Sequence, residues 1–541
     1  MIMITDKINF WKNITLISVL TITINTACTK NFDRLNTNQH EATEDMMATD
    51  NLKTGAFFSQ MQRNTVLFKD GSNLSSDYQI AQGLTSDVYS GYIAPTGTWY
   101  GGVHNGSYYF ITGWIEKTFT SGFASVMPAW QSIKKIADQQ GLPEVAALAT
   151  IVKVQAMHRV ADSYGSIPYN NFGSGTLQNT YSSQQDVYAK FFAELDTAIN
   201  VLTLFAQANP STTVLKNYDH IYKGNVVSWI KFVNTLRLRL AMRVVYANAS
   251  LAQTEAEKSI NNPFGVISTS NERAVLQQSS NLVYYHPLQE IAYSFNAGEA
   301  RMSASMDAYM NGYADPRRAI YFTKADDGNY HGVRQGIVTS NWTPYTGVKI
   351  SNLNMSLSTP IVWMTAAESY FLRAEGALRG WNMGGTAQNF YNLGIEASFL
   401  ENGLQTSDAS TYSANSTLAP IAFTDNSGQS GNNASAPSTI KIAWNAADPF
   451  ETNLERIITQ KWIAMYPDGP EGWAEFRRTG YPKLFPVVSN QSNGTINTAV
   501  QIRRIAYPLS EYNNNRAGVL SGVSLLGGPD GGGTKLWWDK K

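Results

Sequence analysis

The sequence predicts a mostly α-helical protein in which paired helices alternate with long irregular segments. Several long stretches repeat apolar residues every three to four positions, which is the period of a helix. Ala, Gly and Tyr recur at their contact positions, as in the helix hairpins of tetratricopeptide repeats, although no regular repeat register is present. The segments between these stretches are rich in Gly, Pro, Ser and Asn, which favours irregular structure there.

The helical period places the expected helices in chain order. They fall within residues 143–160, 184–202, 225–245, 363–381, 387–403 and 454–466. In 225–245 apolar residues cover nearly the whole circumference, so this helix is expected to be buried on all sides. In 363–381 small residues such as Gly376 allow a neighbouring helix to approach closely.

Two long segments lack this period. Ser268–Val348 mixes short apolar runs with Gly and Pro, and Gln405–Asp448 is rich in Ser, Asn, Thr and Ala. Loops of this length inside a compact domain are usually functional or disordered. No linker suggests two independent domains, so we expect one domain over residues 51–541.

The N-terminus holds the single cysteine of the chain. Lys7 and Lys12 precede the apolar run Ile14–Ile24, and the small residues Thr26 and Ala27 stand directly before Cys28. This order is typical of a secretory signal peptide, and the run is too short and polar for a membrane span. The small–small–Cys ending resembles a bacterial lipobox, except that Asn25 stands where Leu is usual.

The N-terminal pattern therefore predicts a lipoprotein signal peptide at 1–27, an acylated Cys28, and a polar tether at 28–50. Two or three acyl chains anchor a protein stably, whereas one binds a membrane only marginally. An ordinary signal peptide or a buried free cysteine is the alternative. A lone cysteine excludes an intramolecular disulfide and a cysteine-rich zinc site.

The composition excludes some classes of function. Lys plus Arg and Asp plus Glu both number 41, and no basic tract is present, so the chain lacks the electrostatic footprint of a nucleic-acid-binding protein. Charged residues make up 15% of the chain and aromatic residues 12%. This low-charge, aromatic-rich composition is typical of an exported protein that handles carbohydrates or other ligands, although a large core also consumes aromatics.

Four stretches, taken in order, resemble the SusD/RagB family of nutrient-binding lipoproteins, and its SusD-like branch most. They are "TKNFDRLNTN" after Cys28, "RVADSYGSIPYNN" from Arg159, "WIKFVNTLRLRLAMRV" from Trp229, and "QKWIAMYPDGPEGWAEFRRTGYPKL" from Gln460 with "RRIAYPLSEYNNN" and "LWWD" after it. They span nearly the whole chain after Cys28.

These family stretches are expected to be structural. In "DSYGSIPY" we expect Gly165 to end a helix, Pro168 to fix the exit, and Asp162 and Tyr164 to hydrogen-bond within the turn. Arg477 and Arg478 of "EFRRTGYP" are expected to pair with carboxylates or cap carbonyls.

The resemblance implies a fold of four tetratricopeptide-like helix pairs packed against an irregular, loop-rich, ligand-binding half. It also implies a lipid-anchored protein at the surface of the outer membrane of a Gram-negative bacterium. There it would bind a nutrient and deliver it to a SusC-like TonB-dependent transporter, its partner. Family members bind glycans or other nutrients, so the ligand is left open between an oligosaccharide, which the Trp and Tyr excess favours, and a peptide.

Aromatic loop residues are the candidates for ligand contact, because sugars stack on exposed aromatic faces. The richest stretch is "DVYSGYIAPTGTWYGGVHNGSYYF" from Asp87, and the second is "NYHGVRQGIVTSNWTPYTG" from Asn329. The alternatives are an aromatic core hairpin or a contact with the transporter. The candidate residues are Tyr89, Tyr92, Trp99 and Tyr100 in the first stretch, and Tyr330, Arg334, Trp342 and Tyr345 in the second.

The sequence offers little catalytic chemistry. It contains no G-x-S-x-G, H-E-x-x-H or G-x-x-x-x-G-K-[ST] motif, and its six His are far apart. We therefore expect no catalytic residues, no metal site and no cofactor. Two other hypotheses stay open: a surface lipoprotein glycoside hydrolase, whose paired carboxylates are a spatial rather than a sequence feature, and a helical-repeat protein that binds only other proteins.

Overall fold

The computed structural model describes residues 51–71, 73–97, 99–175, 178–295 and 298–541, without the side chains of Trp99 and Tyr100. The expected signal peptide, Cys28 and the tether lie outside these residues, so their assignments stay predictions. The chain divides into two units at Lys53, and the account below concerns the compact unit from Thr54 to Lys541.

Most of the regular structure is helical. The α-helices are α4 (Leu52–Thr65), α5 (Ser75–Tyr78), α6 (Ser86–Tyr89), α7 (Lys117–Thr120), α8 (Met127–Gln140), α9 (Pro143–Tyr164), α10 (Gln184–Ala208), α11 (Val226–Arg243), α12 (Ala249–Asn261), α13 (Pro287–Tyr293), α14 (Ala304–Gly312), α15 (Arg318–Tyr321), α16 (Ala366–Leu378), α17 (Ala387–Glu401), α18 (Thr406–Ser413), α19 (Phe450–Ala464), α20 (Gly469–Thr479), α21 (Leu509–Asn514) and α22 (Arg516–Ser524). The strands are β1 (Ile93–Pro95), β2 (Ala274–Leu276), β3 (Ala300–Met302) and β4 (Ile361–Met364).

The long helices start where the sequence supplies an N-cap. Ser183 accepts a hydrogen bond from the Asp186 amide at the start of α10, and Asn225 and Thr365 cap α11 and α16 in the same way. Each cap satisfies an amide that the first helical turn leaves without a partner. Gly141, in the left-handed region with φ +68°, ends α8 and leads directly into α9.

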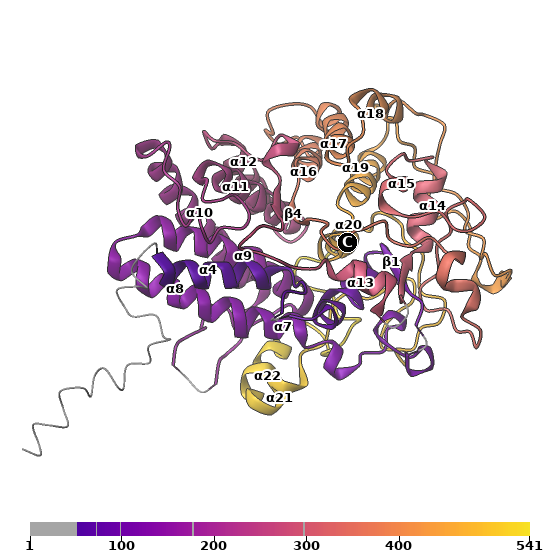
Figure 1. Ribbon diagram of the computed structural model, residues 1–541, viewed down its shortest axis with the longest axis horizontal. Helices are drawn as coiled ribbons and strands as arrows, with labels where there is room; N and C mark the ends of the chain where they lie inside the picture. Colours follow the sequence, from indigo (N-terminus) through magenta and orange to yellow (C-terminus); the bar gives the residue numbers. More distant parts are fainter. Residues whose placement is uncertain (1–50, 72, 98, 176–177, 296–297) are drawn as a thin grey trace, which may run out of the picture. The chain divides into compact units, whose positions relative to one another are not determined.

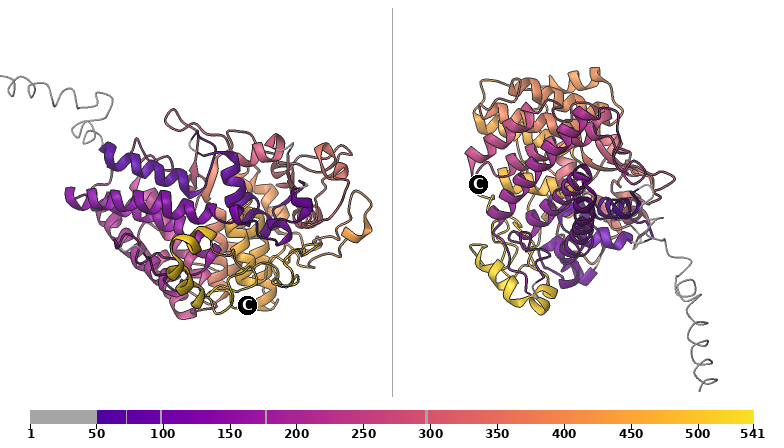
Figure 2. Two further views of the ribbon diagram at one scale, coloured as in Figure 1. Left: turned by 90° about the horizontal axis from the view of Figure 1, so that it is seen from below. Right: turned by 90° about the vertical axis from the view of Figure 1, so that its left-hand side faces the viewer.

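Consecutive long helices pack side by side. Helix α9 contacts α8 and α10, α11 contacts α10, α12 and α16, and α16 contacts α17 and α19, an order that can be followed in Figure 1 and in the turned views of Figure 2. We call α8–α12, α16, α17, α19 and α20 the helical half. The expectation of a mostly α-helical protein built from neighbouring helix pairs is confirmed.

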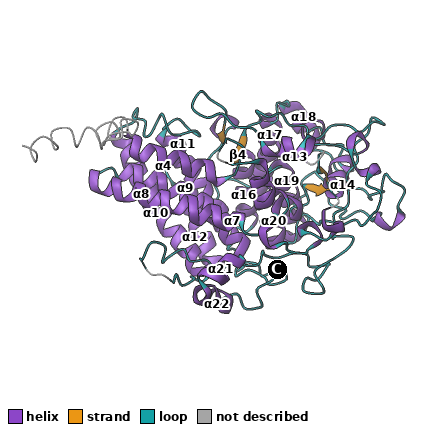
Figure 3. Cartoon of the chain, turned by 60° about the horizontal axis from the view of Figure 1, so that its bottom comes forward, coloured by secondary structure: helices purple, strands orange, loops and turns teal. Residues whose placement is uncertain are grey.

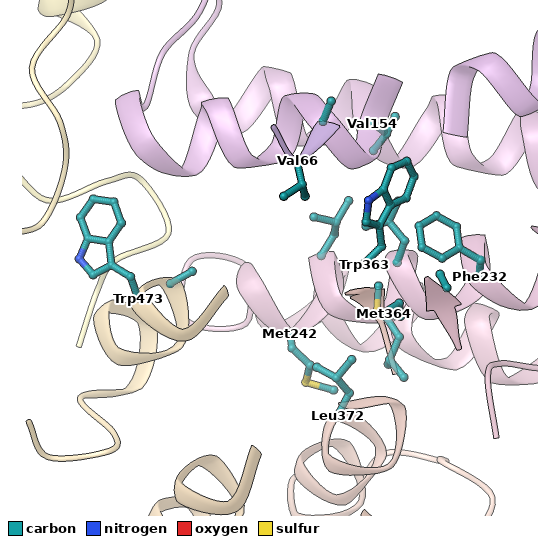
Figure 4. Close-up of a cluster of buried hydrophobic side chains, with 14 of the residues drawn as sticks. Val66, Val154, Phe232, Met242, Trp363, Met364, Leu372 and Trp473 are labelled. Atoms are coloured by element: carbon teal, nitrogen blue, oxygen red, sulfur yellow. The ribbon is translucent and has the colours of Figure 1, made fainter. Parts of the chain in front are cut away.

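The core of the helical half is continuous. Figure 4 shows Val154 of α9, Phe232 of α11 and Trp363 of β4 drawn together, with the rings of Phe232 and Trp363 6.2 Å apart. Helix α11 is buried along almost its full length, as its all-round apolar pattern predicts.

The remaining segments form what we call the loop-rich half: residues 66–116, 263–360, 414–449 and 480–508. Figure 3 shows these loops gathered around α13 and α14. Ser268–Val348, expected to be mixed, contains β2, α13, β3, α14 and α15. Most of Gln405–Asp448 is irregular, and its regular structure begins with α18.

Two short antiparallel pairs join distant parts of the loop-rich half. Strand β1 pairs with β3, with Pro95 opposite Ala300, and the Thr96 amide donates to the Glu299 carbonyl over 2.9 Å. Gly97 and Gly298, which flank these two residues, therefore leave the same end of the pair. Strand β2 pairs with β4 at the edge of the helical half.

The arginines of "EFRRTGYP" have the structural role expected of them. The Arg478 guanidinium bonds to the carboxylates of Glu375, over 2.6 Å, and Glu475, and Arg477 donates to the Asp162 and Arg503 carbonyls.

The carboxylate of Asp162 differs from expectation. It does not bond within its own turn but accepts hydrogen bonds from Arg243 over 3.2 Å and from Trp538 Nε1 over 2.9 Å. The turn is thereby tied to the core by side chains far along the chain.

Candidate ligand-binding site

The two candidate tyrosines of the first aromatic stretch whose side chains the structure describes, Tyr89 and Tyr92, are packed inside the protein. Tyr89 lies against Trp473, with ring centroids 5.2 Å apart, and its hydroxyl donates to the Asn105 carbonyl. Tyr92 is fully buried, stacks on Trp462 at 5.4 Å and donates to the Trp462 carbonyl over 2.6 Å. With both rings covered by protein, neither offers a face for a ligand to stack on.

The other two candidates of this stretch, Trp99 and Tyr100, have side chains outside the described part of the structure. Their backbone is described and forms a single 3₁₀ turn, Trp99–Gly102. This turn begins four residues after the end of β1. The role of the two side chains stays a prediction.

Arg334 and Tyr345, from the second stretch, tie loops together. The Arg334 guanidinium donates to the Asn432 carbonyl over 3.1 Å and to the Pro486 carbonyl over 2.9 Å. The Tyr345 hydroxyl donates to Asp425 over 2.9 Å, and its ring is almost completely buried. Both side chains use their polar atoms on the protein itself, which fixes the loops around them.

Trp342 is only half-buried and packs against a small apolar cluster that includes Ala94 of β1 and Tyr345. Its ring centroid lies 5.9 Å from that of Tyr345. Because Ala94 of β1 and Tyr345 belong to one cluster, the two aromatic stretches of the sequence converge beside β1. We call Trp342 and the residues 99–102, 293–295 and 298–299 the aromatic rim.

Tyr293 is a residue of the rim that the sequence analysis missed. It ends α13, its ring is 43% exposed, and its hydroxyl donates to the Leu353 carbonyl over 2.7 Å, which holds the ring in place. A search restricted to Gly- and Ser-rich loops passes over an aromatic residue at a helix end. The Glu299 amide donates to the Ile291 carbonyl over 2.9 Å, which holds the end of α13 beside the start of β3.

Tyr330, the remaining candidate, lines a cavity of about 680 Å³ between α14 and the loop 421–428. The Arg318 guanidinium lies 4.5 Å from the centre of its ring. Amide and carboxylate groups surround the cavity, including Asn311, Asp307 and Asp425. Planar amides and carboxylates of this kind suit the hydroxyl groups of a sugar, because they offer donors and acceptors side by side.

The charges around this cavity are restrained by hydrogen bonds. Asp307 accepts a bond from the Gly332 amide over 2.7 Å, and burial raises the pKa of its carboxyl. Arg318 Nη1 donates to Asn311 Oδ1 over 2.6 Å, which connects α15 to α14. The loop 421–428 is joined in turn to Tyr345 through Asp425, and the ring of Tyr345 packs against Trp342 of the rim, so the cavity is connected to the rim by these side chains.

Within the described residues, no group of three or more His, Cys, Asp and Glu side chains is arranged to hold a metal ion. In the same part of the chain no helix combines the length and apolarity needed to cross a membrane.

Comparison with known proteins identifies relatives over almost the whole chain. Residues 34–539 match the SusD-like family model, described as "Susd and RagB outer membrane lipoprotein". A search of curated proteins finds no match. Among solved structures, a chitin-binding SusD homolog from Flavobacterium johnsoniae is 41% identical, with a TM-score of 0.85 over 90% of this chain and 99% of its own.

Other solved structures agree in fold. A SusD homolog from Bacteroides uniformis is 34% identical with a TM-score of 0.84, and one from Bacteroides thetaiotaomicron is 36% identical with a TM-score of 0.81. In both cases 90% of this chain and 99% of the other are covered. The resemblance on four short stretches thus extends to the full helical fold.

Proposed function

The chain belongs to the SusD/RagB family of outer membrane lipoproteins, and from this we propose that it binds an oligosaccharide and passes it to a partner transporter. The observation that carries the proposal is the 41% identity to a chitin-binding relative across 90% of the chain. We propose as ligand a chitin-type oligosaccharide, that is, a chain of β-linked N-acetylglucosamine units.

The aromatic rim is the place we propose for this ligand. A pyranose ring presents flat C–H faces, which pack on aromatic rings, and its substituents require hydrogen-bonding partners. Trp342 and Tyr293 supply partly exposed rings held by neighbouring side chains. The cavity lined by Tyr330 and Asn311 adjoins the rim and supplies amide groups for hydroxyl and acetamido substituents. Trp99 and Tyr100 follow β1 at the same place and are proposed as further contacts.

We propose further that the protein is exposed at the surface of the outer membrane, anchored by acyl chains on Cys28 after removal of residues 1–27. Its partner would be a SusC-like TonB-dependent transporter. The family description as an outer membrane lipoprotein supports the anchor, and the lone cysteine after a short apolar run fits it. Release of bound oligosaccharide to the transporter, rather than its cleavage, is the activity we assign.

The test is calorimetry with the hexamer of N-acetylglucosamine, using protein that lacks residues 1–28, a removal that leaves the compact unit from Thr54 onward intact. Trp342→Ala is expected to weaken binding at least tenfold, or about 1.4 kcal/mol, because a central aromatic contact is lost. The matched control is Phe450→Ala, which removes a partly exposed ring in the helical half and should leave affinity unchanged.

Three outcomes decide the proposal. Binding of the hexamer that survives Trp342→Ala would place the ligand away from the rim. Equal binding of cellohexaose, which lacks the acetamido groups, would remove the chitin assignment. Heat released by a peptide mixture but by neither sugar would favour the peptide-binding alternative, and shortened products after long incubation would favour a hydrolase.

A further inference from the structure

A second cavity lies at the edge of the helical half and shares no lining residue with the site proposed above. Its volume is about 450 Å³, within the range of small-molecule sites. Three parts of the chain form it: residues 220–223 before α11, residues 270–279 around β2, and Leu400 and Glu401 at the end of α17.

Two cationic side chains line this cavity. Among the described residues, neither Lys223 nor Arg273 has an ion-pair partner within 4.0 Å, and Arg273 Nη1 donates to the Glu401 carbonyl over 3.3 Å. Burial raises the pKa of the Glu401 carboxyl, and the nearby charge of Arg273 lowers it in part. With two cations and this one carboxyl in its lining, the cavity carries a net positive charge.

The remaining titratable groups of the lining do little to oppose an anion. Burial lowers the pKa of His220 to about 4, so it is neutral at pH 7, and its Nε2 lies 2.6 Å from the Ser59 hydroxyl. Glu401 points its carboxylate at the start of α16, where it accepts from the Ala366 amide over 2.8 Å. Burial also raises the pKa of Glu401 to about 7, which reduces its negative charge near neutral pH.

The loop that carries Lys223 is held in place by hydrogen bonds within the protein. The buried Asp219 carboxylate accepts bonds from the amides of Ile221 and Gly224 and from Trp229 Nε1. This network fixes the loop so that Lys223 takes a φ of +53°, a left-handed conformation that is rare for lysine. Such conformations persist where the surroundings enforce them, and they cluster at ligand sites.

The opposite wall supplies uncharged polar groups. Asn271 and Gln277 are exposed side chains of the lining, and their amide groups offer donors and acceptors to a ligand.

From these features we propose that the cavity is a binding site for an acidic sugar, specifically a hexuronic acid. The carboxylate would lie between Lys223 and Arg273, and the ring hydroxyls would bond to Asn271 and Gln277. This site is separate from the aromatic rim, and its ligand is charged where the ligand proposed for the rim is neutral. It would let the protein retain a glycan that carries uronic acid units.

The experiment is calorimetry of the protein lacking residues 1–28 with sodium galacturonate, with galactose and inorganic sulfate at the same ionic strength as controls. Galacturonate should bind saturably and galactose at least tenfold more weakly. Lys223→Gln should weaken galacturonate binding at least tenfold, and Asn271→Ala should weaken it a few-fold. Lys216→Gln is the matched control, because Lys216 is exposed in the same loop but does not line the cavity, and it should bind as the parent protein does.

Each contrary result overturns the assignment. Equal binding of galactose would mean that the cations are not used, and equal binding of sulfate would mean that the site selects charge and not a sugar. Equal losses in Lys216→Gln and Lys223→Gln would mean a diffuse electrostatic effect. Binding of the N-acetylglucosamine hexamer to Lys223→Gln, measured in parallel, reports on the aromatic rim and separates a failure of this proposal from a failure of the proposed function.

Discussion

In the helical half, buried ion pairs join different helices. In the loop-rich half, the buried pair of Arg317 and Asp315 lies within one turn of the chain, and contacts between distant loops include side chains that donate to backbone carbonyls. Arg239 of α11 bonds to Glu368 of α16 at 2.6 and 2.7 Å with both side chains buried. In the loop-rich half, Arg334 donates to two carbonyls, and Tyr309 donates to the Lys483 carbonyl.

This difference indicates how much structural change each half can accommodate. A buried ion pair is strongly directional, and separating its partners leaves a charge without solvent, so the helices that carry such pairs are held in one arrangement. A neutral hydrogen bond contributes about 1 kcal/mol and can be exchanged for a bond to water or to a ligand. The helical half is therefore suited to be a rigid frame, and the loop-rich half to adjust around what it binds.

The largest effect is expected from Arg243→Met. The Arg243 guanidinium is fully buried and bonds to Asp162, Glu471 and Glu475. Its removal leaves these carboxylates short of a partner, which should lower the free energy of unfolding by about 3–5 kcal/mol. Urea denaturation measures this loss from the midpoint at constant slope.

The control for this variant is Lys258→Met, which breaks ion pairs with Asp196 and Glu255 at a solvent-exposed ammonium. Solvent screening limits its expected cost to about 1 kcal/mol or less. If both variants lost the same stability, buried pairing would not be what makes the helical half rigid.

A smaller effect is expected from Asp87, where the two halves adjoin through α6 and α20. Burial raises the pKa of its carboxyl to about 7, although Tyr78 and Gln82 donate hydrogen bonds to it. A folded-state pKa above the unfolded one means that this carboxyl stabilises the protein in acid and that the benefit is lost as the pH rises to about 7 and beyond.

Between pH 5 and pH 8 the contribution of Asp87 should fall by about 2–3 kcal/mol, at 1.36 kcal/mol per pH unit below the folded pKa. Urea denaturation of the parent protein and of Asp87→Asn at both pH values isolates this contribution, since other titrating groups are common to the two. A parent and variant with the same pH dependence would show that Asp87 is ionised in the folded protein throughout this range.

The smallest effect is expected from Tyr345→Phe in the loop-rich half. The substitution removes hydroxyl contacts to Asp425 and Ser427, but Asp425 keeps its bond from Asn432 Nδ2 at 2.7 Å. The cost should be about 1 kcal/mol. Hydrogen exchange should become faster in residues 423–434 and stay unchanged in α11. A loss of protection spread over the helical half would contradict the separation of the two halves.

The helices were predictable because their signals are local. The apolar period lies inside 143–160 and 184–202, Ser183 directly before the second segment caps α10, and the structure extends the two segments only to α9 and α10. For the helix expected at 454–466, the structure places α19 at Phe450–Ala464, an offset of a few residues. Helix α20 was recognised only as part of a family stretch. Its charged residues obscure the apolar pattern in the sequence, because no local signal shows that they form ion pairs in the folded protein.

The candidate site was predictable only in part, because exposure depends on distant residues. Tyr92 and Trp342 both stand among Gly, Ser and Thr in the sequence. Tyr92 is buried because Trp462, 370 positions later, accepts its hydrogen bond and covers its ring. No local pattern contains that information. The convergence of the two aromatic stretches likewise follows from the pairing of β1 with β3. Neither short strand has a sequence pattern that predicts this pairing.

The bond between Trp538 and Asp162 bears on how the chain reaches its native state after synthesis. These residues are 376 positions apart, yet both belong to the interior of the helical half. As the chain is synthesised, α9 and α11 emerge long before the C-terminal segment that completes their packing. The entropic cost of closing so large a loop opposes the contact between Trp538 and Asp162. The unfinished chain is thus expected to stay loosely folded while the ribosome is still at work. That delay suits a protein that is to be threaded across a membrane, because an export channel accepts a chain that has not yet closed on itself.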